Sequence, residues 1–198
     1  MSKFQDTFRI ESARLQEWDY SNPWWYYVTI NTKDHIHYFG KVENGKMILN
    51  DLGKVVEEEW LRTKLFRLNI DSDYYVIMPN HFHGIIIINH VETRRGVSQK
   101  NEKQLTSETR RGESLQAETY PQFGKPIKNS LSVIINQFKG SVKRWANSNN
   151  NSNFSWQPRF YDRIIRNEKE LYNIRKYIEQ NPLKWELEKD KPENIFDL

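Results

Sequence analysis

The clearest hydrophobic pattern is a pair of apolar, β-branched runs at residues 75–78 and 85–88, separated by Pro79-Asn80 and His81-Phe82-His83. Runs of this length with a Pro-Asn step between them predict two buried strands joined by a tight turn. Side chains two apart on a strand share a face, so both imidazoles should project together while Phe82 packs on the other side. Two imidazoles buried on such a strand need polar partners, which makes the pair a candidate site.

Earlier segments predict the elements that precede this strand pair. Residues 24–31 are aromatic and β-branched throughout and predict a central strand buried on both faces. Asn44-Gly45 between two short apolar runs predicts a β-hairpin over residues 42–49. Apolar residues at helical spacing then predict a core helix to about residue 69, capped by Asn50 or Asp51.

Later segments predict two more helices and an edge strand. Residues 130–146 have an apolar stripe with lysines on other faces, which predicts an amphipathic helix with a basic flank. Arginines alternate with apolar residues over 156–166 and predict a turn that leads into an edge strand. The last helix is expected to begin at the cap Asn167 and to end at Asn181, where Pro182 stops it.

The order of these elements favours one domain over residues 1–198, with an α+β fold. The expected architecture is a ferredoxin-like antiparallel sheet with helices packed on one face. Residues 89–129 are polar, with few apolar anchors, and are interpreted as a flexible insertion. A charged C-terminal tail is expected from about residue 183.

The amino-acid composition limits the kinds of metal site, cellular location and binding partner to be expected. The chain has no cysteine, so a metal would be held by histidine, carboxylate or amide oxygen, and magnesium or manganese is the expected ion. No apolar run approaches the roughly 18 residues needed to cross a bilayer, and the N-terminus lacks a signal-peptide pattern, so a cytoplasmic location is expected. The net charge of +4 and the 14% aromatic content suit single-stranded nucleic acid.

Basic and aromatic side chains in the second half are candidate DNA contacts. They are Arg159, Arg163, Arg166, Lys139, Lys143 and Trp156.

A second His-x-His pair, His35 and His37, lies in a polar stretch that is more typical of surface histidines than of a ligand site.

Phosphodiester chemistry needs neutralised charge on the phosphate and a nucleophile in line with the leaving oxygen. A divalent ion on His81 and His83 would supply the first, and neutral imidazole nitrogens suit manganese better than magnesium. Tyr177 is a candidate nucleophile on the last helix. Asn181 lies one helical turn later and is a candidate third ligand, with Gln180 as the competing residue.

Three motifs in this order resemble the HUH (His-hydrophobic-His) single-tyrosine transposases, an IS200-like family, and in particular their REP-associated tyrosine transposase branch. They are Met78-Pro79-Asn80-His81-Phe82-His83, then Trp156-Gln157-Pro158-Arg159-Phe160 with Arg163 and Ile165-Arg166-Asn167, and Tyr177-Ile178-Glu179-Gln180-Asn181-Pro182. The resemblance spans most of residues 24–185 but not the insertion. It implies transposition or DNA recombination on single-stranded or hairpin DNA, His81 and His83 as metal ligands, and a 5′-phosphotyrosine on Tyr177. It also implies that Asn181 binds or orients the metal.

Two alternatives remain at this stage. The first is a domesticated, non-catalytic binder of folded single-stranded DNA, favoured by the aromatic residues and the arginines. The second is an ordinary metal phosphodiesterase that uses water as the nucleophile. Either a homodimer or a monomer is compatible with the sequence, so Tyr177 is expected beside the histidines of its own chain or of a partner. The DNA target and the retention of catalysis stay open.

Overall fold

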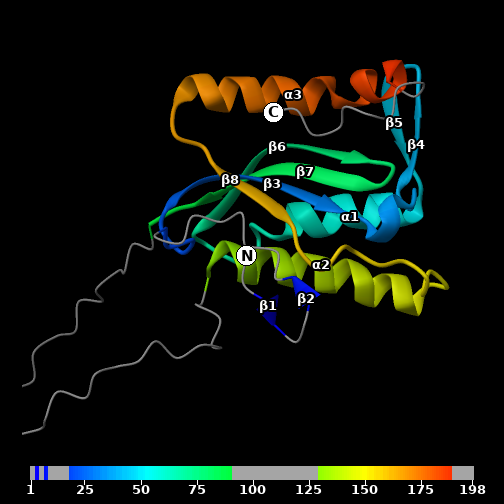
Figure 1. Cartoon of the computed structure of the whole chain (residues 1–198), viewed down its shortest axis with the longest axis horizontal. Helices are drawn as coiled ribbons and strands as arrows, with labels where there is room; N and C mark the ends of the chain where they lie inside the picture. The colour runs from blue at the N-terminus through cyan, green and yellow to red at the C-terminus, as the bar shows by residue number, and fades with distance from the viewer. Residues whose placement is uncertain (1–2, 5–6, 9–17, 91–128, 189–198) are drawn as a thin grey trace, which may run out of the picture.

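The computed structural model describes residues 3–4, 7–8, 18–90 and 129–188. Its centre is a four-stranded antiparallel sheet with the strand order β6-β7-β3-β8 (Figure 1). The strands of this sheet are β3 (Trp24–Asn31), β6 (Ile70–Met78), β7 (His81–Ile88) and β8 (Tyr161–Ile164). The helices are α1 (Asp51–Arg62), α2 (Leu131–Ser148) and α3 (Glu168–Leu187), with a short 3-10 helix η1 (Lys33–His35). The remaining strands form two two-stranded antiparallel sheets, β1 (Lys3–Phe4) with β2 (Thr7–Phe8) and β4 (Gly40–Glu43) with β5 (Lys46–Leu49).

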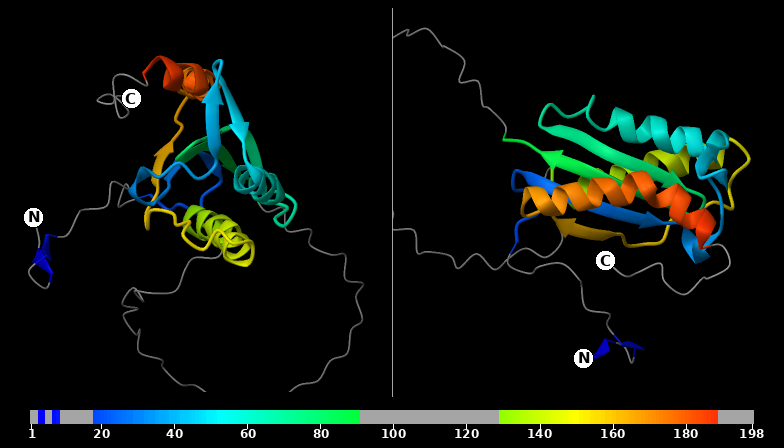
Figure 2. Two further views of the ribbon diagram at one scale, coloured as in Figure 1. Left: turned by 90° about the vertical axis from the view of Figure 1, so that its right-hand side faces the viewer. Right: turned by 90° about the horizontal axis from the view of Figure 1, so that it is seen from above.

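The chain order β3, α1, β6, β7, α2, β8 is the strand-helix-strand-strand-helix-strand order of ferredoxin-like folds. The predicted α+β class with an antiparallel sheet is therefore confirmed. The prediction of helices on one face holds for α1 and α2, whereas α3 covers the opposite face, as both views of Figure 2 make clear. The sheet is thus the middle layer of three.

Alternation along β3 explains why both faces of the sheet are covered. Tyr26, Val28 and Ile30 belong to the large core formed with α1 and α2. Tyr27 belongs to a smaller core that includes Ile178 of α3. Side chains of a central strand point alternately to the two faces, so a strand with apolar residues on both faces suits a sheet with helices on both sides.

The predicted hairpin at Asn44-Gly45 is present, and it contacts the end of α3. Both turn residues have positive φ, 53° and 68°, as a two-residue turn of the primed type requires. The Glu186 carboxylate of α3 accepts hydrogen bonds from the backbone N–H groups of Asn44, at 3.0 Å, and Gly45. The β4–β5 hairpin stands at the C-terminal end of α3 (Figure 1) and so fixes that end against the body of the protein.

Helix starts were predicted better than helix ends. Asn50 and Asn167 cap α1 and α3 as expected, each side chain accepting a backbone N–H at 2.9 Å. The expected end of α1 near residue 69 is wrong, because the helix ends at Arg62. Leu65 and Phe66, which were assigned to its apolar stripe, are 73% and 70% exposed. Helical spacing of apolar residues does not by itself show that they are buried, and the buried stripe of α1 ends at Trp60.

The expected end of α3 at Asn181 is also wrong. The helix continues through Pro182 to Leu187, into the part of the chain that was assigned to a charged tail. A proline inside a helix removes one backbone hydrogen bond, and here the later turns are held by other contacts, such as Glu186 with the hairpin. Most of the expected insertion, residues 91–128, lies outside the described residues.

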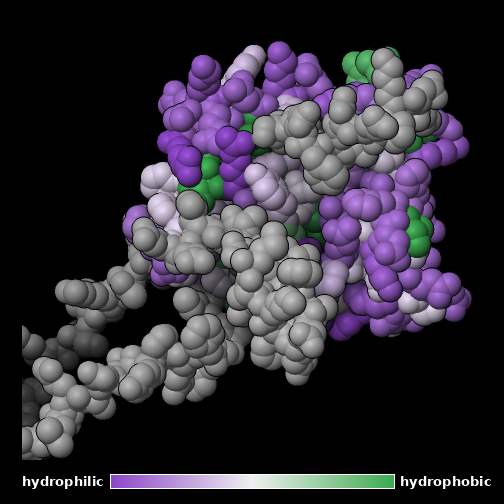
Figure 3. Space-filling view, viewed as in Figure 1, coloured by the Kyte–Doolittle hydropathy of each residue, from purple (hydrophilic) through white to green (hydrophobic). Residues whose placement is uncertain are grey.

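The surface seen in Figure 3 is mainly hydrophilic, with small and separate hydrophobic areas. In the part of the chain that the structure describes, no helix combines the length and the apolar character needed to cross a membrane.

Candidate active site

The two histidines of β7 lie on the sheet face that α3 covers. Their strand neighbours on β3 are Asn31, opposite His81, and Thr29, opposite His83. Phe82 points to the other face and packs on Trp60, with ring centroids 4.6 Å apart. His81 and His83 are 5% and 4% exposed, and their ring centroids lie 4.6 Å apart. The strand therefore presents two neighbouring, nearly buried imidazoles to α3.

α3 brings the candidate nucleophile to the same place in the same chain. The ring of Tyr177 lies 5.3 Å from that of His83, centroid to centroid. Asn181 is buried, and its side chain hydrogen-bonds both to His81 and to Tyr177. Of the two amides weighed from the sequence, Asn181 is buried at the site, whereas Gln180 is exposed. The structure thus brings together His81, His83, Tyr177 and Asn181, although their chemical roles stay predictions.

Each imidazole has neutral partners at its Nδ1 atom. His83 Nδ1 lies 2.7 Å from the Tyr27 hydroxyl and 2.9 Å from the Thr29 hydroxyl. His81 Nδ1 lies 2.6 Å from the side-chain oxygen of Asn80. The other ring nitrogen of His83, Nε2, is buried and has no hydrogen-bond partner. An unpartnered buried nitrogen is costly, and such an atom in a native site calls for an explanation.

Burial keeps both imidazoles neutral. It lowers the pKa of His81 to about 3, helped by the nearby His35 and opposed by the Asn181 hydrogen bond. It also lowers the pKa of His83 well below its usual range, with His81 adding to the effect. Burial raises the pKa of the Tyr177 phenol, whereas its hydrogen bond with Asn181 lowers it. Neutral imidazole is the form that binds metal, so the pair is in its ligand form at neutral pH.

These shifts predict an acid-sensitive fold. A histidine with a lowered folded-state pKa binds protons preferentially when unfolded, so stability is full above pH 6.5 and falls as the pH decreases toward 3. The loss should reach about 1.4 kcal/mol per pH unit for each histidine. Urea unfolding of metal-free protein at pH 7.5, 6 and 5 measures it. In the double variant His81→Gln/His83→Gln the decline should be much smaller, and an equal decline would assign the acid sensitivity to other groups.

The residues present fit a divalent ion. The lone pair of His83 Nε2 has no other partner, His81 lies beside it, and the buried amide of Asn181 adjoins both His81 and Tyr177. Over the described ranges, no cluster of three or more His, Cys, Asp or Glu side chains is arranged to hold a metal. Two imidazoles with an amide oxygen form a neutral ligand set of nitrogen and oxygen, which suits manganese better than magnesium.

The pocket beside these residues is small. Its volume is about 30 Å³, and its lining is His81, Tyr177, Asn181, Lys184, Trp185 and Glu188. This space is enough for an ion or one or two water molecules. The Trp185 ring lies 5.6 Å from the rings of both His81 and His37, so α3 carries an aromatic wall between the two His-x-His pairs.

Three of the candidate DNA contacts have structural partners inside the protein. Lys139 is buried rather than exposed on a basic flank, and its ammonium donates to the carbonyls of Gln157 and Pro158 at 2.6 and 3.2 Å. Lys143 donates to two backbone carbonyls of the same loop region. Trp156 packs on aromatic core residues and donates its N–H to the Lys139 carbonyl. All three fasten α2 to the segment before β8, a structural role that the sequence did not indicate.

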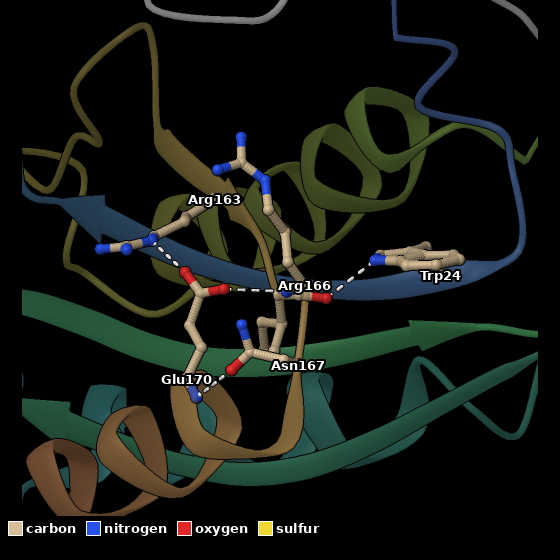
Figure 4. Close-up of polar contacts among 6 residues, drawn as sticks. Trp24, Arg163, Arg166, Asn167 and Glu170 are labelled. Carbon is tan, nitrogen blue, oxygen red and sulfur yellow. Dashed lines mark hydrogen bonds and ion pairs between the residues drawn. The ribbon is translucent and has the colours of Figure 1, made fainter.

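The arginines lie on the surface. Arg163 donates from Nε to the Glu170 carboxylate at 2.5 Å, and the same carboxylate accepts the backbone N–H of Arg166. The Arg166 guanidinium points away from Glu170 (Figure 4). Arg159 is also exposed.

A groove of about 500 Å³ follows Arg163 and Arg166 between β8 and the first turns of α3. Its lining is Tyr27, Tyr161, Arg163, Arg166, Asn167, Lys169, Glu170, Asn173 and Ile174. The groove includes Tyr27, whose hydroxyl contacts His83, so a basic surface leads to the edge of the candidate site.

Sequence reasoning missed the residues that hold the imidazoles. Tyr27 and Thr29 were assigned only to a buried strand, and Asn80 only to a turn. The useful signal was a phenol and a hydroxyl at the two-residue spacing of a strand, Tyr27 and Thr29. That signal shows a shared face but not which strand lies opposite.

Comparisons with known proteins place this geometry in context. No protein-family model matches the sequence. The chain is 35% identical over 176 residues to an uncharacterized protein of Haemophilus influenzae, and the match covers 88% of this chain and 89% of that protein. The chain belongs to the family of that protein. Since this relative is itself uncharacterized, membership of the family assigns no activity.

The fold is also similar to a solved structure, that of a REP-associated tyrosine transposase bound to a REP hairpin. The TM-score is 0.52 at 16% sequence identity, and the match covers 88% of this chain and 74% of the other. The resemblance noted from the three motifs is therefore supported at the level of the fold.

Proposed function

We propose that this protein is a metal-dependent tyrosine transposase that cleaves and rejoins single-stranded or hairpin DNA through a 5′-phosphotyrosine on Tyr177. The observation that carries the proposal is the position of Tyr177 beside His83, whose buried Nε2 has no partner. The fold shared with a transposase bound to a DNA hairpin supports the same substrate class. A metal phosphodiesterase that uses water would not need a tyrosine next to the ligand pair.

The chemistry conserves the energy of the cleaved bond. The Tyr177 phenol loses its proton, its oxygen attacks the phosphorus, and the bond from phosphorus to the 3′-oxygen breaks. The 3′-oxygen leaves with a proton as a free hydroxyl, and the 5′-phosphate stays on the tyrosine. In the reverse direction a 3′-hydroxyl attacks the phosphotyrosine, which joins the strands and releases the phenol.

Burial and the Glu188 carboxylate raise the pKa of the Tyr177 phenol, so the free protein holds it as the neutral phenol. The hydrogen bond with Asn181 lowers the pKa of the phenol against the effect of burial. The Lys184 ammonium lies 5.9 Å from the centroid of the tyrosine ring and is paired with Glu188 at 3.7 Å. A divalent ion on His81, His83 and Asn181 would act as a Lewis acid that neutralises charge on the phosphate.

The groove beside β8 supports binding of a single strand. Arg163, Arg166 and Lys169 provide cations for phosphates, and the half-exposed ring of Tyr161 provides a surface on which a base can stack. Because Tyr27 lines the groove and its hydroxyl contacts His83, a strand lying in the groove would pass close to the imidazoles, beside the N-terminal half of α3.

Formation of a covalent adduct tests the proposal. Purified protein with Mn²⁺ is incubated with a library of labelled single-stranded oligonucleotides that contain hairpins, and then denatured. We expect a labelled band at the mass of protein plus DNA that appears only with the divalent ion and disappears with a chelator. Absence of any adduct across the library would refute the proposal. Cleaved DNA without an adduct would instead identify a hydrolase that uses water.

One observation favours a second candidate, a non-catalytic binder of folded single-stranded DNA. The pocket beside Tyr177 has a volume of about 30 Å³, far less than a nucleotide needs, and His81 is nearly buried beneath Trp185. A binder would use the basic groove alone. It would bind hairpin DNA in a salt-sensitive manner and give no cleavage with any divalent ion.

A further inference from the structure

Three neutral side chains contact the Nδ1 atoms of the histidine pair. Tyr27 and Thr29 contact His83, and Asn80 contacts His81. Tyr27 and Thr29 come from β3, and the antiparallel register of β3 with β7 places Thr29 directly opposite His83. The ring of Tyr27 also stacks on His83, with centroids 5.6 Å apart and planes inclined by 18°.

The tautomer of each imidazole follows from these contacts. The Asn80 amide donates its N–H to the His35 carbonyl at 3.1 Å, so its oxygen is the atom that faces His81 Nδ1 and accepts the proton. At His83, an Nδ1 proton has two hydroxyl oxygens as acceptors. A proton on Nε2 would instead be a buried donor without a partner, which costs about 1–3 kcal/mol. Both rings therefore carry the proton on Nδ1.

We propose that Tyr27 and Thr29 are positioning residues that hold the His83 imidazole as the Nδ1–H tautomer, with its Nε2 lone pair directed at the metal. The inference rests on the proposed function, because it assigns a purpose to the unpartnered Nε2 atom. Metal-bound histidines usually donate their second nitrogen to an acceptor, which fixes the ring and its tautomer. Here the acceptors are hydroxyl groups rather than a carboxylate.

Neutral acceptors have a consequence for the substrate. The hydroxyl acceptors add no negative charge behind the imidazoles, and the Glu188 carboxylate that lines the same pocket is paired with Lys184 at 3.7 Å. An anionic phosphate is then attracted more strongly than it would be if a carboxylate supported each histidine. The hydroxyl pair therefore suits a site that attracts an anionic phosphodiester.

The test compares the double variant Tyr27→Phe/Thr29→Val with the wild type. Both replacements keep the buried volume and remove the two acceptors. Nitrogen-15 NMR of the histidine rings in metal-free protein should show Nδ1–H at His83 in the wild type and a shift toward Nε2–H in the variant. Mn²⁺ affinity, measured by calorimetry, should fall about tenfold to a hundredfold.

Two further variants separate positioning from general damage to the fold. Tyr26→Phe is the matched control, because its hydroxyl contacts Trp18 and Asn22 on the opposite face, and it should change neither readout. The variant Tyr27→Phe/Thr29→Ser restores one acceptor and should recover most of the Mn²⁺ affinity. If the double variant does not fold, Thr29→Val alone is measured against Thr29→Ser.

The outcomes distinguish this inference from the proposed function. A wild type with the Nδ1–H tautomer that binds no Mn²⁺ would overturn the metal-dependent function. Unchanged tautomer and unchanged Mn²⁺ affinity in the double variant would overturn the positioning role alone and leave the proposed function standing.

Discussion

Tyr177→Phe is expected to abolish the covalent protein–DNA adduct while the variant still binds the same DNA. The substitution removes only the hydroxyl group, and without it no phosphotyrosine can form. Adduct formation should fall at least about a thousandfold, to the background of the assay. The fold should lose about 1 kcal/mol, because one hydrogen bond with Asn181 is lost at a half-buried position.

Tyr172→Phe is the matched control for this experiment. Tyr172 lies on the same helix, five residues earlier, and is 64% exposed. Its substitution should leave adduct formation and stability unchanged. If Tyr177→Phe still forms the adduct at the rate of the wild type, then another residue is the nucleophile. If it cleaves DNA without an adduct as fast as the wild type does, water is the nucleophile.

The sequence predicted those parts of the site that depend on local spacing. His81 and His83 share a face because they lie two apart on a strand, and Tyr177 and Asn181 share one because they lie four apart on a helix. The helix caps at Asn50 and Asn167 are also local, since each side chain bonds a backbone group three residues away. Such features need no knowledge of the rest of the fold.

The parts that sequence reasoning missed depend on which segments meet. The role of Thr29 requires the register that places it opposite His83, 54 residues away in the chain. From the sequence, Lys139 was assigned as a DNA contact, whereas in the fold its ammonium donates to two carbonyls of the loop before β8. From the sequence, Glu186 belongs to the charged tail, whereas in the fold its carboxylate accepts two N–H groups of the β4–β5 turn. In each case a polar side chain has a partner that helical or strand periodicity cannot identify.

Packing also explains how one chain completes the site. Two contacts hold α3 against the rest of the protein. Arg175 pairs with Asp73 of β6 at 2.7 Å, and Glu186 accepts backbone N–H groups of the β4–β5 hairpin. Tyr177 and Asn181 lie between these two contacts. Tyr177 and the histidines therefore meet within a single chain.

If His81 and His83 hold the metal as proposed, their substitution should separate catalysis from DNA binding. In His81→Ala or His83→Ala, Mn²⁺ affinity should fall at least about a hundredfold, and the adduct should disappear with it. The control is His90→Ala, an exposed histidine just beyond the other end of β7. Calorimetry measures the Mn²⁺ affinity, and denaturing gels measure the amount of covalent adduct.

Binding of the same histidine variants to hairpin DNA is measured in the absence of metal. The basic groove lies along β8 and the first turns of α3, so its arginines stay in place when an imidazole on β7 is removed. Binding to hairpin DNA should therefore change less than about threefold while the adduct is lost, as expected when phosphate contacts dominate affinity. If the wild type binds hairpins but neither takes up Mn²⁺ nor forms an adduct, the protein is a binder and the histidine pair is structural. If His83→Ala loses DNA binding and cleavage together, the DNA contacts the β7 site itself, because the groove alone cannot account for the affinity.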